Sequence, residues 1–212
     1  LAARGENEEA RTWLERSLAS HRATGDDLHI GVGLNLLTLA EISRSEGKIA
    51  QAHEGYRKAL AELKLIDPPA PHFVAAAQVA FGASLSQAGE WEEARPLLAS
   101  ALETSRQING ETSPNLCHYL SACAENWMRL GDLERAEPLI LESIEITRAG
   151  LPPDGISSAK NFEVYARLLL RQGRPAEALP ILETSLAVYE AQFSPSHPSV
   201  RALREQVEKL RQ

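Results

Sequence analysis

The chain has 212 residues, of which 43% are hydrophobic and 24% charged, a balance typical of a water-soluble protein with a sizeable core. Its net charge of −7 and pI of about 5.5 give no sign of the basic surface that nucleic-acid-binding proteins usually carry. No stretch approaches the ~20 apolar residues of a membrane span, and we expect Cys117 and Cys123 to be free thiols in a reducing cytoplasm.

Glycines recur every 42 residues, at positions 5, 47, 89, 131 and 173. Five residues after each glycine stands an alanine, and eight residues further on stands a leucine or isoleucine. A period between about 20 and 50 residues is typical of solenoid proteins, in which each repeat packs on its neighbours. The register therefore predicts an all-α array rather than a compact bundle.

Each period predicts two helices that flank its glycine. Around Gly131, apolar residues recur at helical spacing on both sides, and glycine suits the left-handed residue that ends the first helix. Segments rich in proline and glycine separate the periods, at 67–72, 109–114, 151–156 and 193–198. Each repeat is thus predicted to be an antiparallel helix pair.

The copies differ in completeness and in detail along the chain. Only residues 1–4 precede Gly5, so the first repeat lacks nearly all of its first helix, and we interpret the chain as part of a longer polypeptide. The apolar stretch 73–85 predicts a buried helix interrupted by Gln78. At the other end, about 198–211 predicts a helix with one apolar face, as a polar cap on a solenoid requires.

Three of the predicted second helices contain a proline seven residues after their glycine: Pro96, Pro138 and Pro180. A proline in a helix interior removes a backbone hydrogen bond and costs about 3 kcal/mol. We expect these prolines to lie near the helix start, where one lost bond costs less and can bend the helix.

The sequence resembles the tetratricopeptide repeat, in the 42-residue form of kinesin light chains and many bacterial multidomain proteins. The segment "SPNLCHYLSACAENWMRLGDLERAEPLILESIEI" carries the resemblance, and "HPSV" at 197–200 repeats its opening. The resemblance implies one α-solenoid over 1–212, with about four full repeats, a partial N-terminal repeat and the C-terminal capping helix. It also implies small residues where the two helices of a repeat cross, at Ala40, Gly82, Ala124 and Ala166 in the first helices and Ala52, Ala94, Ala136 and Ala178 in the second. Large residues such as Tyr56, Leu98, Ile140 and Leu182 are expected between repeats.

No motif for catalysis, cofactor or metal binding occurs. Phosphate-binding glycine loops and the H-E-x-x-H zinc motif are absent, and the six histidines are scattered over different segments. Trp91 and Trp127 fall at positions that predict core packing. We therefore expect neither an enzyme nor a cofactor- or metal-binding protein.

In the family, the first helix of each repeat lines a concave surface along which ligands bind. The resemblance assigns the partner-binding residues to that surface: Leu37, Glu41, Arg44, Val79, His118, Glu125, Arg129, Lys160, Glu163, Arg167 and Arg171. Two interpretations of the charged end stay open. Glu125–Arg129 and Glu163–Arg167 can form pairs within one helix, or the excess of basic residues can attract an acidic partner segment.

The leading hypothesis is a non-enzymatic interaction module that binds a protein or peptide on this concave face, without nucleic acid or membrane insertion. The alternative is a regulatory or spacer arm fused to a larger signalling enzyme, such as a bacterial kinase or signalling ATPase.

Overall fold

The computed structural model describes residues 2–24, 29–66, 69–152 and 154–212. Over these ranges the regular structure is entirely α-helical and no strand occurs, as the sequence predicted. The chain forms two compact units, Leu1–Thr104 and Ser105–Gln212. The division falls inside a single helix, α5 (Trp91–Asn109).

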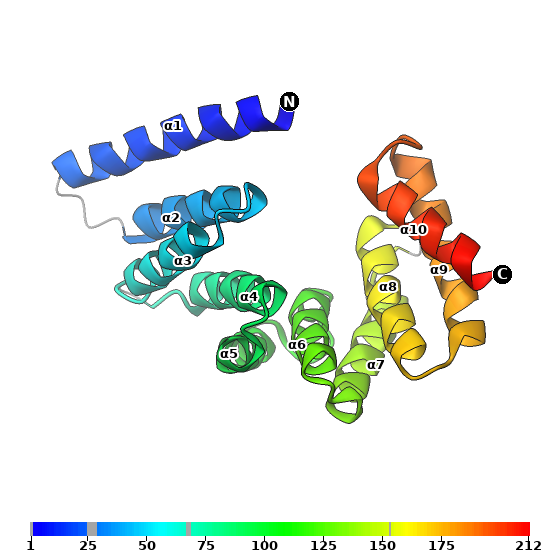
Figure 1. The fold of residues 1–212 in the computed structure, drawn as a ribbon. Helices are drawn as coiled ribbons and strands as arrows, with labels where there is room; N and C mark the ends of the chain where they lie inside the picture. The colour runs from blue at the N-terminus through cyan, green and yellow to red at the C-terminus, as the bar shows by residue number, and fades with distance from the viewer. Residues whose placement is uncertain (1, 25–28, 67–68, 153) are drawn as a thin grey trace. The chain divides into compact units, whose positions relative to one another are not determined.

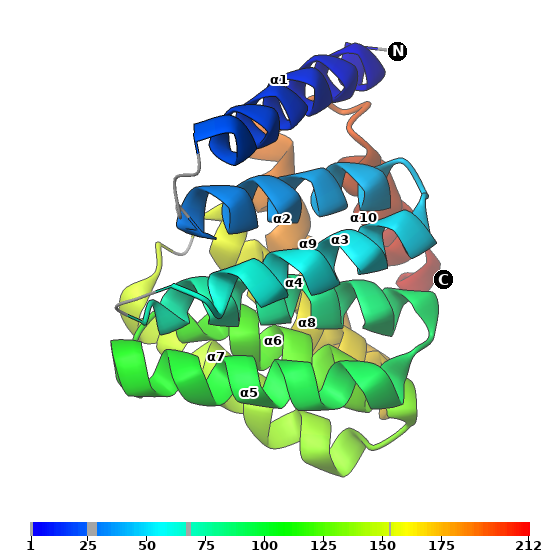
Figure 2. The ribbon, with the colours of Figure 1, turned by 90° about the vertical axis from the view of Figure 1, so that its left-hand side faces the viewer.

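The first unit contains helices that follow one another as antiparallel neighbours (Figures 1 and 2). These are α1 (Ala2–Thr24), α2 (His29–Ser45), α3 (Ile49–Leu63), α4 (Pro71–Ala88) and most of α5. We call the first helix of each repeat its A helix, here α2 and α4, and the second its B helix, here α1, α3 and α5. Residues 67 and 68 of the predicted breaker at 67–72 lie outside the described residues.

The second unit continues the same alternation. After the end of α5 come α6 (Leu116–Leu130), α7 (Leu133–Gly150), α8 (Ile156–Arg171), α9 (Pro175–Gln192) and α10 (Pro198–Leu210). The A helices α6 and α8 pack on the B helices α7 and α9, and also on one another, so their faces adjoin. The terminal helix α10 covers α9 and buries Val200, Leu203 and Val207, which matches the predicted cap.

The repeat glycines end the A helices as predicted. Gly47, Gly89, Gly131 and Gly173 have φ angles of 76°, 91°, 84° and 73°, a left-handed conformation that other residues adopt only at a cost. Asp132 follows Gly131 and caps α7, because its carboxylate accepts a hydrogen bond from the backbone N–H of Arg135 at 3.0 Å. Gly5 differs from the other four, since it lies inside α1 and ends no helix.

Small residues hold the helices of each repeat close together. Ala52, Ala94, Ala136 and Ala178 in the B helices have no exposed surface. A methyl group added to Gly82 would lie 2.7 Å from Leu98 Cδ2, which is closer than atoms can pack, so α4 and α5 meet at this glycine. The predicted large residues between repeats, Tyr56, Leu98, Ile140 and Leu182, are all buried. The small residues that the resemblance implied are thus buried, and Gly82 lies where two helices of one repeat meet.

The three prolines lie at the sixth position of α5, α7 and α9. Pro96, Pro138 and Pro180 are exposed, and each helix continues through its proline. The carbonyl group that loses its partner belongs to an exposed residue in the first turn, where water can replace the missing bond. This position explains why the repeat tolerates a proline.

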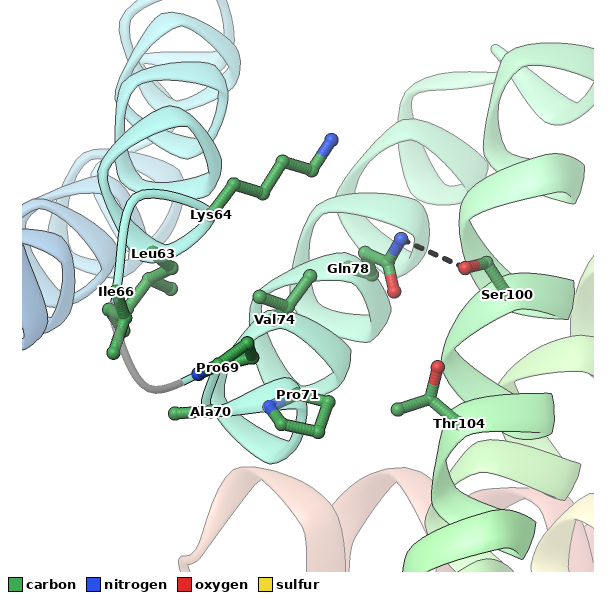
Figure 3. Close-up of a pocket in the computed structure, with 10 residues that line it drawn as sticks. All are labelled: Leu63, Lys64, Ile66, Pro69, Ala70, Pro71, Val74, Gln78, Ser100 and Thr104. Carbon is green, nitrogen blue, oxygen red and sulfur yellow. Dashed lines mark hydrogen bonds between the residues drawn. The ribbon is translucent and has the colours of Figure 1, made fainter.

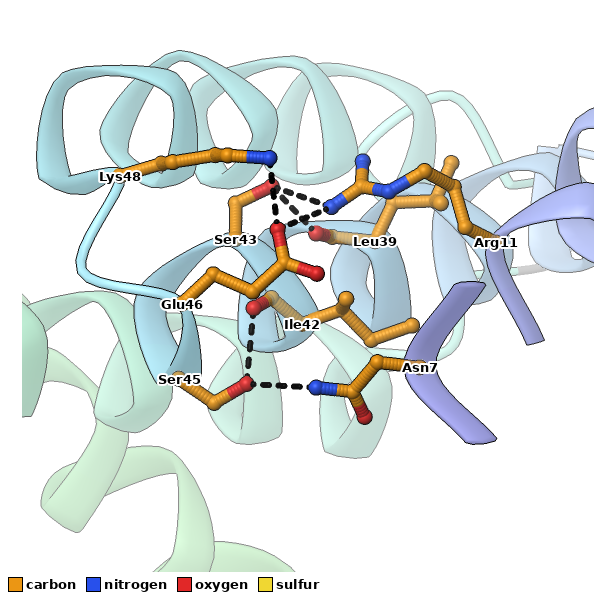
Figure 4. A network of polar contacts seen from close by, with 8 residues as sticks. All are labelled: Asn7, Arg11, Leu39, Ile42, Ser43, Ser45, Glu46 and Lys48. Atoms are coloured by element: carbon orange, nitrogen blue, oxygen red, sulfur yellow. Dashed lines mark hydrogen bonds and ion pairs between the residues drawn. The ribbon is translucent and has the colours of Figure 1, made fainter. Parts of the chain in front are cut away.

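Polar contacts attach α1 to the end of α2 (Figure 4). The Arg11 guanidinium donates to Glu46 Oε2 at 3.0 Å, and Lys48 Nζ lies 2.8 Å from the same oxygen. Asn7 Nδ2 donates to Ser45 Oγ at 3.3 Å. The hydrogen bond from Lys48 lowers the pKa of Glu46 most, and the positive charges of Arg11 and Lys48 lower it further, so the carboxylate stays ionised.

Candidate functional site

In the first unit, the predicted site residues of α2 form a connected polar group. Glu41 Oε2 accepts a hydrogen bond from Arg44 at 2.8 Å, and Arg44 Nη1 donates to Gln87 Oε1 of the next A helix at 3.3 Å. The buried Tyr56 donates its hydroxyl to Glu41 Oε1 at 2.5 Å. Burial and the bond to Glu41 raise the pKa of Tyr56, and the bond to Glu41 raises the pKa of Arg44. The charges of Glu41 and Arg44 therefore compensate one another within this group.

The two apolar members of the predicted site differ in exposure. Leu37 is half-buried on α2. Val79 is only 3% exposed, because it packs inside the first unit. Val79 therefore belongs to the core and lines no surface that a partner could contact.

In the second unit, the charged residues of α6 and α8 pair between repeats. Arg167 Nη1 of α8 lies 2.7 Å from Glu125 Oε1 of α6, exactly one period away in the sequence. Arg171 Nη1 donates to the backbone oxygen of Met128 at 2.8 Å. One interpretation of the sequence paired Arg167 with Glu163 of its own helix. In the structure Arg167 pairs instead with Glu125 of the neighbouring A helix.

Glu163 lies half-buried between charged neighbours. Its Oε1 is buried and has no hydrogen-bond partner among the described residues, while Tyr189 of α9 donates to the carboxylate. The pKa of Glu163 is raised, first of all by burial, against the hydrogen bond from Tyr189 and the charges of Arg167 and Lys160. The Glu163 carboxylate is therefore partly desolvated beside two basic residues.

Two of the remaining predicted residues of this unit keep a positive charge at the surface. Arg129 and Lys160 are exposed and form no ion pair with any residue that the structure describes. The pKa of His118 is lowered, by desolvation first and by Lys160 second. We call these residues of α6 and α8 the charged A-helix face: His118, Glu125, Arg129, Lys160, Glu163, Arg167 and Arg171.

A cluster of buried polar side chains joins the helices α6, α7 and α8, and the sequence analysis did not predict it. Asn161 of α8 donates from Nδ2 to Thr147 Oγ1 at 2.8 Å, and its Oδ1 accepts from Ser121 Oγ at 3.3 Å. The Cys117 thiol donates to the carbonyl of Ser143 at 3.5 Å. The cluster links α6, α7 and α8 through polar groups, which the repeating pattern of apolar residues in the sequence does not predict.

The structure also contains a pocket that the sequence did not predict, in the first unit (Figure 3). It measures about 240 Å³ and lies between the end of α3, the start of α4 and the second half of α5. The side chains that line it are Leu63, Lys64, Ile66, Pro69, Ala70, Pro71, Val74, Gln78, Ser100 and Thr104. The only sequence signal was Gln78, the polar residue that interrupts the apolar stretch of α4.

Other candidate groups take structural roles. Both cysteines are free and buried. Trp127 is partly buried, with the Arg135 guanidinium 4.7 Å from its ring centroid, whereas Trp91 is 36% exposed and donates its indole N–H to the carbonyl of Ser86. The prediction of a core position is therefore wrong for Trp91. Among the described residues, no three metal-ligating side chains gather, and no helix is long and apolar enough to cross a membrane.

Known proteins share the repeat and the fold. Sequence models described as tetratricopeptide repeat match residues 1–16, 73–149 and 166–199. No curated protein matches the chain at a significant level. Among solved structures, BtubC (BKLC) from P. vanneervenii has a TM-score of 0.77 at 18% identity, over 96% of this chain and 82% of that one.

Two further structures are similar over most of their lengths. A putative kinesin light chain of Podosopora anserina with TPR-like repeats has a TM-score of 0.64 at 20% identity, over 82% of this chain and 83% of that one. PilF of Pseudomonas aeruginosa has a TM-score of 0.52 at 17% identity, over 97% and 93%. At these identities the likeness concerns the fold, and it agrees with the repeat register and the matched segments. The chain belongs to the tetratricopeptide-repeat family.

Proposed function

We propose that the chain is a non-enzymatic binding module that holds an acidic segment of a partner protein on the charged A-helix face. Scaffolds of tetratricopeptide repeats are in general protein-interaction modules, and solenoids offer extended surfaces to their partners. The fold by itself does not identify the partner, so the proposal depends on the chemistry of this face.

The observation that carries the proposal is the uncompensated positive charge on α6 and α8. Arg167 and Glu125 neutralise one another, and Arg171 donates to a carbonyl group that carries no net charge. Arg129 and Lys160 form no ion pair with a described residue. The face therefore keeps a basic excess on a chain whose net charge is −7, and such a field attracts an acidic segment.

The experiment selects peptides from a random library displayed on phage, with the chain as bait, and measures the binding of the best synthetic peptide by fluorescence anisotropy. We expect selected peptides rich in Asp and Glu. The variant Arg129→Glu/Lys160→Glu should bind them roughly tenfold more weakly, because exposed pairs contribute about 0.2–1 kcal/mol each and reversal replaces attraction by repulsion.

The matched control is Arg148→Glu/Arg201→Glu, which changes the net charge equally at exposed positions of α7 and α10. The control should bind like the parent, and binding to the parent should weaken as salt rises. Selection without enrichment of acidic residues would contradict the proposal. An equal loss in both double variants would contradict it too, because net charge alone would then explain the effect.

A further inference from the structure

The pocket of the first unit contains a polar side chain at a position where the other repeats place apolar ones. Gln78 stands eleven residues before Gly89, and the same offset from the other repeat glycines gives Leu36, Leu120 and Phe162. Leu120 is fully buried in its repeat. The third repeat therefore carries an amide in a core position, and the pocket lies beside that amide.

The Gln78 side chain is buried and only partly satisfied. The residue is 9% exposed, and its Nε2 donates to Ser100 Oγ at 3.1 Å. Its Oε1 is buried and has no hydrogen-bond partner among the described residues. In Figure 3 the Gln78 side chain projects from α4 toward Ser100 and Thr104 of α5, and all three residues line the pocket. A buried acceptor without a partner is destabilising and therefore rare in native proteins.

The amide and the walls together indicate what the pocket can bind. Since the Ser100 hydroxyl can donate as well as accept, the Gln78 amide can present either its oxygen or its nitrogen to the pocket. A peptide group carries one donor and one acceptor, and so suits both orientations. Leu63, Ile66 and Val74 supply apolar walls.

The size of the pocket narrows the ligand class further. Its volume of about 240 Å³ lies below the range of about 300–1,000 Å³ that is typical of cofactor and drug-sized sites. It is large enough for one apolar side chain, whose burial removes the wall carbons from water.

We propose that this pocket binds one apolar side chain of a partner segment, with the adjacent peptide group hydrogen-bonded to Gln78. The proposal rests on the proposed function, in that the ligand is a polypeptide. It adds a specificity site in the first unit, made of different residues from the charged A-helix face of the second.

The test uses a small probe, so that it does not depend on finding the partner. N-acetyl-L-leucine N-methylamide is titrated into the ¹⁵N-labelled chain, and the side-chain NH₂ signals of Gln78 are followed by NMR. They are assigned from their loss in Gln78→Leu. We expect a saturable shift of these signals. N-acetylglycine N-methylamide, which has the peptide groups without the apolar side chain, should bind at least about tenfold more weakly.

Two variants locate the binding. Val74→Phe fills the pocket and keeps the Gln78 amide, so the shift of that amide should disappear. Gln51→Leu removes an exposed glutamine of α3 and should bind the leucine probe like the parent. In Gln78→Leu, which restores the leucine of positions 36 and 120, the backbone signals around the pocket should no longer respond.

Three results would overturn the proposal. They are the absence of a saturable shift, as expected of a pocket that only holds water, equal affinity for the glycine and leucine probes, and unchanged binding in Val74→Phe. A failure of the phage selection contradicts the proposed function and leaves the probe titration unaffected, so the two ideas can fail separately.

Discussion

Replacing Ala136 by leucine tests whether the helices of one repeat touch where the structure places their crossing. Ala136 has no exposed surface and belongs to the buried cluster that includes Ala124, Ile140 and Leu168. Leucine adds three carbons there. If free space existed, each added carbon would stabilise the fold by about 0.8 kcal/mol through burial. In a close-packed crossing the same carbons force the helices apart, at a cost of about 1–3 kcal/mol.

The two cases differ in sign, so an equilibrium measurement separates them. We expect Ala136→Leu to lower the free energy of unfolding by about 1–3 kcal/mol, which corresponds to a decrease of about 2–4 °C in Tm for each kcal/mol. Urea unfolding followed by circular dichroism at constant m measures the change. Glu145→Leu is the control, because it places the same side chain at an exposed position of α7 and should change stability by less than about 0.5 kcal/mol. An unchanged or raised stability of Ala136→Leu would refute the packing argument.

Three further predictions concern single groups. Gly131→Ala should lower the free energy of unfolding in urea by about 1–2 kcal/mol, and Gly131→Asn should lower it less. The reason is backbone strain alone, because φ is 84° and no atom lies within 4 Å of an added methyl group. Equal losses in the two variants would indicate another cause. Burial raises the pKa of Cys123 to about 12, so a disulfide reagent at pH 8 should label this thiol only after urea unfolding, and rapid labelling of the folded chain would contradict its burial. Because the pKa of Glu46 is lower in the folded state than in the unfolded chain, its stabilising effect is present above about pH 4.3 and is lost as pH falls through the folded value. Glu46→Gln should lack this part of the pH dependence of unfolding, and an identical pH profile for both proteins would rule out the Arg11–Glu46–Lys48 contact.

The helices and their turns were predictable because they depend on local chemistry. Glycine adopts a positive φ without a side-chain clash, so its recurrence predicted where the A helices end. The family resemblance implied a close helix crossing at the recurring alanine, and Ala94 and Ala178 are fully buried. Gly5 is the exception, because α1 continues through it.

The site was less predictable, because long side chains choose among partners that only packing brings near. Arg167 had a glutamate one turn away in its own helix, yet it pairs with Glu125 of the preceding repeat. Val79 matched the pattern of a surface position but packs inside its unit, and Trp91 matched a core position but lies at the surface. In each case the packing of a neighbouring helix decides the partner or the exposure of the side chain. The residue pattern within one helix carries no information about that packing.

The sequence by itself determined the family, the 42-residue period, the ends of most helices and the small residues at their crossings, since these follow from backbone preferences and side-chain size at fixed spacing. Only the tertiary structure decided which charges are neutralised, which carboxylate is desolvated, and that Gln78 lies at a pocket with an oxygen that no described residue hydrogen-bonds. Those properties depend on distances of a few ångströms between residues far apart in the chain, because hydrogen bonds and ion pairs form only at such distances.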